Sequence, residues 1–197
     1  MEDNKKIKIQ IKSVFGDVLF EYEKENNTIK DTVEEAVRQG ANLGGANLGG
    51  ANLGNAYLGN ADLGGAYLRG ADLGGAYLGG AKNIPYIPMA CPSDGAFIGW
   101  KTVWSNGHYL IKLEIPEDAR RCSATTNKCR CDKAKVLEIF NLDTQEHVKE
   151  VVNKAYNHET TYKAGEMVYP DKFDENRWNE CSNGIHFFIN RQDAIDY

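Results

Sequence analysis

The chain has 197 residues and a formal net charge of −5, from 23 Lys and Arg against 28 Asp and Glu. This length allows one or two domains with a buried core, and so mild a charge creates no global field that would attract nucleic acid or a membrane. No run of about 18 apolar residues occurs, and the charged, alternating N-terminus MEDNKKIKIQIK is unlike a signal peptide. We therefore expect a cytoplasmic protein that binds neither nucleic acid nor membrane.

Residues 1–40 predict a hairpin followed by a helix. The segments KIKIQIK and VLFEY alternate in polarity and flank a turn at Gly16–Asp17, which is typical of a β-hairpin. From Thr28, the sequence TIKDTVEEAVRQG places its apolar residues on one helical face, and Gly40 ends the helix. This ββα unit either caps the segment that follows or forms an independent small domain.

Residues 41–80 are eight pentapeptides without an insertion: ANLGG, ANLGG, ANLGN, AYLGN, ADLGG, AYLRG, ADLGG and AYLGG. A period of five fits neither a helix nor a strand, but it fits a chain that turns one corner per repeat and points Leu and Ala inward. Four corners close a coil, so the region makes two coils that bond through their backbones at about 4.8 Å spacing. Glycine permits the positive φ that such tight turns need.

The A(N/D)LXX pattern resembles the pentapeptide-repeat family, and the resemblance implies a right-handed quadrilateral β-helix. Two coils are short for a repeat protein, so their ends need covering. We expect residues 1–40 to form an N-terminal ββα cap and the proline-containing residues 81–94 to form a linker or capping loop. If the far end stays open, its backbone edges and Leu side chains favour a homodimer through the β-helix ends.

Residues one coil apart share an outer face, which pairs Tyr57 with Tyr77. Together with Tyr67, these rings predict an interaction surface, because Tyr is favoured in interfaces. The alternative is a solvated wall on which the tyrosines pack against neighbouring parts of the protein. Some pentapeptide-repeat proteins mimic DNA, but two Asp and Arg69 leave these repeats with a charge of only −1. This argues against inhibition of a topoisomerase.

Residues 95–197 predict a separate C-terminal α+β domain. The segments AFIGWKTVW and YLIKLEI are strand-like, and Asn106–Gly107 between them is a strong hairpin signal. AKVLEIF, TYK, EMVY and GIHFFI are further strand candidates, and INRQDAIDY begins a terminal helix.

Three segments of this domain, FIGWK, IKLEIPEDARRCSATTNKCRCDKAKVLEI and YKAGEMVYPDKFDENRWNECSNGIHFF, resemble an uncharacterised domain that follows pentapeptide repeats in tailed-phage and prophage proteins. The resemblance spans nearly all of residues 95–197. It implies a bacteriophage origin and action in the host bacterial cytosol, where interference with a host process such as antiphage immunity is a reasonable setting. It assigns no activity.

The segment 120–135 is strongly basic and has Asp132 as its only acid. Its side chains beside Ser and Thr hydroxyls could bind a phosphate or carboxylate through charge-assisted hydrogen bonds. Lys128 and Arg130 are the first choices for such a ligand. The alternative is a solvated loop and strand edge, where Lys discourages edge pairing.

Five cysteines, with no secretion signal, predict reduced thiols. Cys122, Cys129 and Cys131 follow a C-x₆-C-x-C spacing, whereas zinc sites usually contain C-x₂-C pairs. We therefore expect structural free thiols and no metal, with zinc as the alternative.

The C-terminal segment GIHFFINRQDAIDY is similar to part of ADP-ribosyltransferase-like folds, in which a G-x-(Y/H)-F strand precedes a helix. This similarity implies a site for NAD or a like nucleotide near His186. The late Glu that such enzymes use does not follow before Tyr197, which argues for an inactive relative. His186 lies between apolar residues, so a hydrogen-bonded core histidine is the alternative.

These observations favour a non-enzymatic interaction or scaffold protein, in which the β-helix carries a domain that binds a host protein or a small anionic ligand. The alternative is an ADP-ribosyltransferase-like nucleotide-binding or enzymatic domain on the same platform. No G-x-S-x-G, P-loop or H-E-x-x-H motif occurs, so no catalytic residue is assigned. The candidate ligand residues are Arg120, Arg121, Lys128, Arg130, Lys133 and His186.

Overall fold

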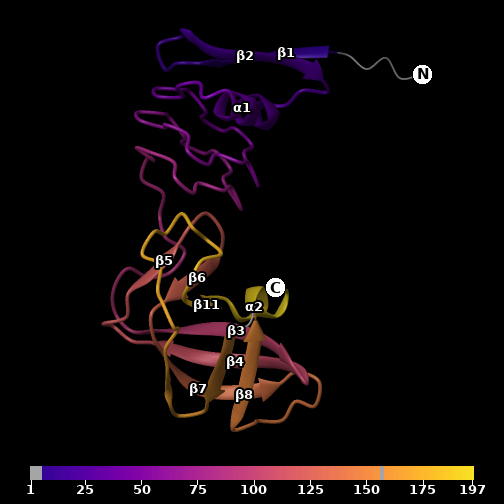
Figure 1. Ribbon diagram of the computed structural model, residues 1–197, viewed down its shortest axis with the longest axis vertical. Helices are drawn as coiled ribbons and strands as arrows, with labels where there is room; N and C mark the ends of the chain where they lie inside the picture. Colours follow the sequence, from indigo (N-terminus) through magenta and orange to yellow (C-terminus); the bar gives the residue numbers. More distant parts are fainter. Residues whose placement is uncertain (1–5, 156–157) are drawn as a thin grey trace, which may run out of the picture. The chain divides into compact units, whose positions relative to one another are not determined.

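The computed structural model describes residues 6–155 and 158–197 (Figure 1). The chain divides into two compact units, Met1–Pro88 and Met89–Tyr197. No helix in the described ranges is both long and apolar enough to cross a membrane.

The first unit begins with the predicted hairpin and helix. Strands β1 (Lys6–Lys12) and β2 (Val18–Glu25) pair antiparallel. Helix α1 (Ile29–Arg38) starts at Thr28, which forms a reciprocal capping box with Asp31. Its buried face contains Val33 and Ala36, so the apolar stripe in the sequence is the packed side of the helix.

The repeat region has no helix or extended strand among residues 41–88, all of which are described. Isolated parallel bridges instead join residues 20 apart, such as Asn47 with Tyr67. The Leu48 N–H donates to the Tyr67 carbonyl over 2.9 Å, and the Tyr67 N–H donates to Ala46 over 2.8 Å. The repeats and these bridges suggest a β-helix, whereas the regular strands of the molecule form antiparallel sheets.

Each position of the pentapeptide has one structural task. The fifth residue has a positive φ throughout, from 57° at Asn55 to 74° at Gly80, which explains why only Gly and Asn occur there. Asn or Asp at the second position accepts from the N–H two residues later, as Asn42 does from Gly44 over 2.8 Å. The third residue points inward, and six of the eight leucines are buried: Leu43, Leu48, Leu53, Leu58, Leu63 and Leu78.

The N-terminal elements bond directly to the early repeats. The Asn47 N–H donates to the Lys12 carbonyl at the end of β1 over 2.7 Å. From α1, Lys30 donates to the Gly54 carbonyl over 3.0 Å, and the Glu34 carboxylate accepts from the Tyr57 N–H over 2.8 Å.

The second unit is built on one antiparallel sheet of seven strands, in the order β10-β7-β4-β3-β11-β6-β5. A separate hairpin and one five-residue helix complete it, so the expected α+β domain is mainly antiparallel sheet. The sheet strands are β3 (Phe97–Ser105), β4 (Gly107–Ile115), β5 (Arg121–Ser123), β6 (Lys128–Cys131), β7 (Ala134–Asn141), β10 (Met167–Val168) and β11 (Ile185–Phe188). The remaining elements are β8 (Glu150–Ala155), β9 (His158–Lys163) and α2 (Arg191–Ile195).

Strand β11 lies inside the sheet although it comes last in the chain, between β3 and β6. A side chain at Gly99 of β3 would place its Cβ 2.6 Å from the Phe187 ring, so only Gly allows this close approach. Phe187 is fully buried with Ile111, Leu113 and other core residues. The insertion brings His186, next to Phe187, into the middle of the sheet.

Candidate functional site

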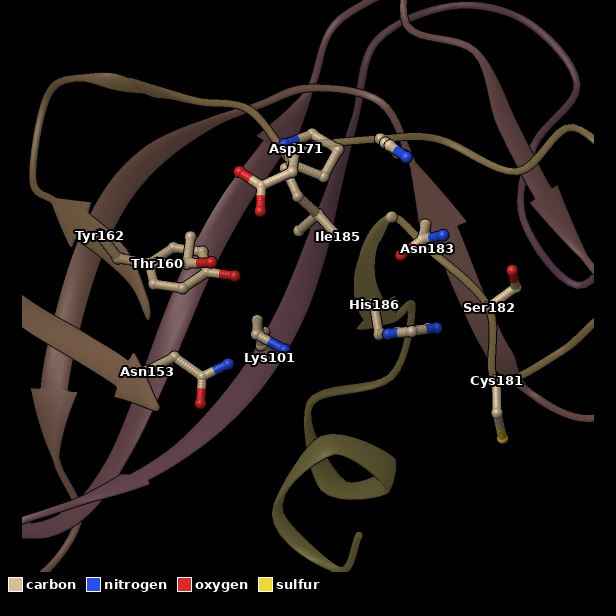
Figure 2. Close-up of a pocket in the computed structure, with 13 residues that line it drawn as sticks. Lys101, Asn153, Thr160, Tyr162, Asp171, Cys181, Ser182, Asn183, Ile185 and His186 are labelled. Atoms are coloured by element: carbon tan, nitrogen blue, oxygen red, sulfur yellow. The ribbon is translucent and has the colours of Figure 1, made fainter. Parts of the chain in front are cut away.

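The second unit contains a cavity of about 500 Å³ whose walls come from segments far apart in the sequence (Figure 2). One wall is β3 with the β8–β9 hairpin, and the other is the segment 181–186, which runs into β11. The lining residues that matter most here are Lys101, Asn153, Thr160, Ser182, Asn183 and His186.

Lys101 is a half-buried cation on β3 that lines this cavity. Its ammonium group has no hydrogen bond or ion pair with any residue of the described ranges. Burial lowers the pKa of Lys101 to about 8, and the charge of Lys128 adds to that shift, while Cys131 opposes it. Figure 2 shows the Lys101 side chain pointing into the pocket toward His186.

His186 lies across the pocket on β11, and its Nε2 is buried with no hydrogen-bond partner in the parts of the chain that the structure describes. Burial lowers the pKa of His186 to about 4, and the positive charges of Lys101, Lys128 and Arg130 add to that shift. A hydrogen bond to the Glu180 backbone opposes it. Nδ1 must make that bond, so Nε2 of the neutral ring is an acceptor that the described residues leave without a donor.

Two more cations lie on β6, whose Arg130 is opposite His186 in the sheet register. Lys128 and Arg130 are only 8% and 2% exposed. The Lys128 ammonium donates to the Cys181 Sγ and the Tyr197 hydroxyl, each over 3.2 Å. Burial acts to lower the pKa of Lys128, but these two hydrogen bonds outweigh it and raise that pKa.

Arg130 holds the loop that forms one wall of the pocket. Its guanidinium donates to the Asn179 carbonyl over 2.7 Å and to the Asn176 carbonyl over 2.9 Å. Asp174 fastens the same loop, and hydrogen bonds, first from Ser182 and then from Asn179, lower the pKa of this carboxyl to about 2. The loop therefore presents Ser182 in a fixed position at the cavity.

Neither Lys128 nor Arg130 forms an ion pair with a carboxylate of residues 6–155 or 158–197. Both side chains direct their donors to neutral protein groups, and their charges lie close enough to lower the pKa of His186. The pocket is therefore set in a positive electrostatic environment.

The other basic residues predicted as ligands are engaged elsewhere. Arg121 donates to backbone carbonyls that include Gly95 over 2.7 Å and Pro116 over 3.0 Å. Arg120 pairs with Asp132 and Glu175, and Lys133 pairs with Asp118. The alternative for residues 120–135 was a solvated loop and strand edge. β5 is indeed an edge strand of the sheet, but Lys128 and Arg130 on β6 are buried and not solvated.

A second hollow, of about 430 Å³, lies beside Arg120 and Arg121. Glu117, Asp118 and Glu175 also line it. Because acidic side chains balance the two arginines, this hollow has no excess positive charge, and the cavity at Lys101 is the better anion site.

Sequence reasoning placed only His186 at this cavity and missed Lys101. A usable signal was present, because Lys101 shares a strand face with Gly99 and Val103, which are both buried. A lysine on the inward face of a central strand marks a buried cation. Asn153 and Thr160 gave no such signal, since the β8 strand was not predicted.

The cysteines are free thiols, and four of the five are buried. A hydrogen bond with Cys91 and then burial raise the pKa of the Cys129 thiol, and burial raises that of Cys131. Cys122 accepts a hydrogen bond from the Arg130 guanidinium over 3.3 Å. Within the described ranges, no three His, Cys, Asp or Glu side chains are grouped to hold a metal ion.

The tyrosines of the repeats are exposed by 45–55% of their surface. Tyr57 and Tyr77 stack with ring centroids 5.0 Å apart and planes inclined by 16°. The Tyr67 ring covers Gly49, where a Cβ would lie 2.6 Å from it. The rings are accessible, and their role as an interaction surface stays a prediction.

Two protein families match this chain, one in each of its two parts. Residues 46–82 match the pentapeptide repeats, in eight copies. Residues 87–194 match a family of unknown function, DUF5758. This match covers more than half of the 197 residues, and the chain therefore belongs to that family. The predicted order, repeats followed by an uncharacterised domain, is confirmed. No curated protein and no solved structure matches the chain.

Proposed function

We propose that the second unit is a ligand-binding module that holds a small anion, a phosphate or carboxylate compound, in the cavity at Lys101. One observation carries this proposal: within the described residues the Lys101 ammonium has no acidic partner, and it lines a cavity whose opposite wall holds His186, a neutral imidazole. A partly buried cation without a counter-ion is costly. A bound anion would supply the missing charge and form charge-assisted hydrogen bonds.

The neutral polar groups of the cavity suit the same ligand. Asn153 and Asn183 carry amide donors that line the space in which an anion would meet Lys101. Lys172 adds a second ammonium to the lining. The one acidic lining residue, Asp171, already interacts with another group of the protein.

We further propose that residues 41–80 form a right-handed, four-sided β-helix of two coils, capped by the ββα elements of residues 1–40. The parallel bridges 20 residues apart, the buried leucines and the bonds from β1 and α1 to the early repeats support this arrangement. In this proposal the repeats are the platform that carries the ligand-binding module. A bacteriophage origin, a host-protein partner and action in the host cytosol rest on the resemblance of residues 95–197 alone.

The test is isothermal titration calorimetry of the full chain with inorganic phosphate, pyrophosphate and a nucleotide panel that includes NAD. We expect one anion site per chain, and Lys101→Met should weaken it by about tenfold or more, because a charge-assisted hydrogen bond contributes about 1.5–3 kcal/mol. Lys112→Met is the matched control, since Lys112 pairs with Glu138 and does not line the cavity.

The outcomes separate the candidate functions. Absence of anion binding, or equal binding by Lys101→Met, would overturn the proposal. Tight binding of NAD, with phosphate alone binding weakly, would favour the ADP-ribosyltransferase-like nucleotide site near His186.

A further inference from the structure

We propose that Lys101 forms a covalent imine with a small anionic carbonyl compound, such as a 2-oxo acid, bound in this cavity. The inference rests on the proposed anion site and names the substrate class of that site. Its basis is that a lysine amine and a histidine line one cavity, and that within the described residues neither the amine nor the histidine Nε2 has a partner.

A lysine attacks a carbonyl only as the neutral amine. Because burial lowers the pKa of Lys101 to about 8, roughly one molecule in ten carries the free amine at pH 7. An exposed lysine with its ordinary pKa has on the order of one in a thousand. No carboxylate of the described ranges pairs with the Lys101 ammonium, so no ion pair stabilises its cationic form.

His186 supplies a proton acceptor at the right place. Its ring is neutral at pH 7, because its pKa is about 4, and its Nε2 lone pair has no partner within the described ranges. Figure 2 shows the imidazole and the Lys101 side chain on facing walls of the pocket. The neutral imidazole on that wall is the group of the cavity that can take the proton that the Lys101 nitrogen loses as it bonds to carbon.

The step balances without an oxidant or a metal. The Lys101 nitrogen lone pair forms a bond to the carbonyl carbon, and the carbonyl oxygen takes up a proton as the nitrogen loses one. The nitrogen then loses its second proton and the oxygen gains another, so that the oxygen leaves as water while the carbon–nitrogen double bond forms. Amine and carbonyl compound thus become imine and one water.

The negative charge of the substrate follows from the surroundings. Lys101 and Lys172 line the cavity, and the charges of Lys128 and Arg130 reach it through β6. A neutral aldehyde would gain nothing from this field, whereas a carboxylate or phosphate next to the carbonyl would be attracted and held. A cavity of about 500 Å³ suits a small molecule.

The experiment uses the full chain with glyoxylate, an anionic aldehyde, and cyanoborohydride, which reduces the imine to a stable amine. Intact mass and peptide mapping then count and locate the adducts. We expect one adduct at Lys101, none there in Lys101→Met, and a slower reaction in His186→Gln. Propanal lacks the carboxylate. It should label Lys101 at a rate lower by a factor of about ten or more, as the loss of a charged contact predicts.

Labelling that is spread over the surface lysines or concentrated on Lys172, or equal labelling by propanal, would overturn the imine inference. Phosphate titration of the same preparation separates the two proposals. If phosphate binds but glyoxylate does not label Lys101, the anion site stands and the imine falls. If phosphate neither binds nor slows labelling, the anion site itself falls. Melting curves of Lys101→Met show whether the variant is folded.

Discussion

The repeat region and the second unit satisfy their polar groups in opposite ways. In the repeats, a polar side chain bonds to backbone two residues away, as Asn42 does to Gly44. In the second unit, the buried Arg130 bonds to Asn176 and Asn179, which are 46 and 49 residues away. The pattern that builds the first region is therefore local in sequence, whereas the pocket exists only after distant segments have come together.

This difference also separates architecture from chemistry. Each repeat bonds mainly to the repeats next to it and 20 residues away. The stability of the repeat region is therefore close to a sum of similar contributions, one from each repeat. The loop of the pocket depends on a few bonds, of which those made by Arg130 are long-range and those made by Asp174 are local. The following predictions test this comparison.

The largest expected effect comes from a buried repeat leucine. Leu53→Ala should lower the free energy of unfolding by about 2–5 kcal/mol, since Leu53 is fully buried. Leu73→Ala, at the same position of another repeat but only half-buried, should cost about half as much. Denaturant unfolding of both variants measures the two costs. Equal losses of unfolding free energy in the two variants would show that the burial of the leucine does not determine its contribution to stability.

Arg130→Met should destabilise the second unit by about 2–4 kcal/mol, because two carbonyls lose a charged hydrogen-bond donor in a buried place. It should also weaken anion binding, since the loop of the pocket loses its anchor. Chemical unfolding and calorimetry report the two effects. Lys133→Met is the control, because Lys133 only pairs with the exposed Asp118, and little change is expected. If Arg130→Met had the stability and the anion affinity of the unmodified protein, the pocket would not depend on this long-range contact, and the contrast with the repeats would be wrong.

Acid should weaken the second unit through His186. Its folded pKa is about 4, below the ordinary 6.5, so the unfolded chain binds the extra proton between these values. Stability is therefore present above pH 6.5 and declines as the pH falls toward 4, by roughly 2–3 kcal/mol from this group. Unfolding at several pH values measures this decline. In His186→Gln the slope should be shallower, and identical slopes in the two proteins would contradict the prediction.

The smallest effect belongs to the tyrosine stack. Tyr77→Ala removes the ring that packs on Tyr57 at 5.0 Å, and a loss of about 1 kcal/mol is expected. Tyr86→Ala is the control, since that side chain is 89% exposed. Thermal unfolding compares the two variants. A similar loss at both positions would show that the stack contributes nothing specific.

Much of the local structure could be predicted from the sequence. The alternation of KIKIQIK, the Thr28 cap and the Asn-Gly turn gave β1, α1 and the β3–β4 hairpin, because neighbouring residues decide each of them. Strands β5 and β6 were not predicted, since RCS and KCRC show no apolar alternation. They are strands because β11 inserts beside β6, with which β5 pairs, and because distant carbonyls and a thiol accept the hydrogen bonds of Arg130.

The sequence by itself determined the local structure of the repeat region. Leu at the third position predicts which side chain is buried, and Gly or Asn at the fifth predicts where the backbone has a positive φ. It also showed that basic residues gather at 120–135, but not that Lys128 and Arg130 would be buried. Only the tertiary structure decided the candidate site, by placing β11 next to β3 and β6. Lys101 and His186 are far apart in the chain, and their pKa values are lowered first by burial and then by nearby positive charges, which only the folded unit provides.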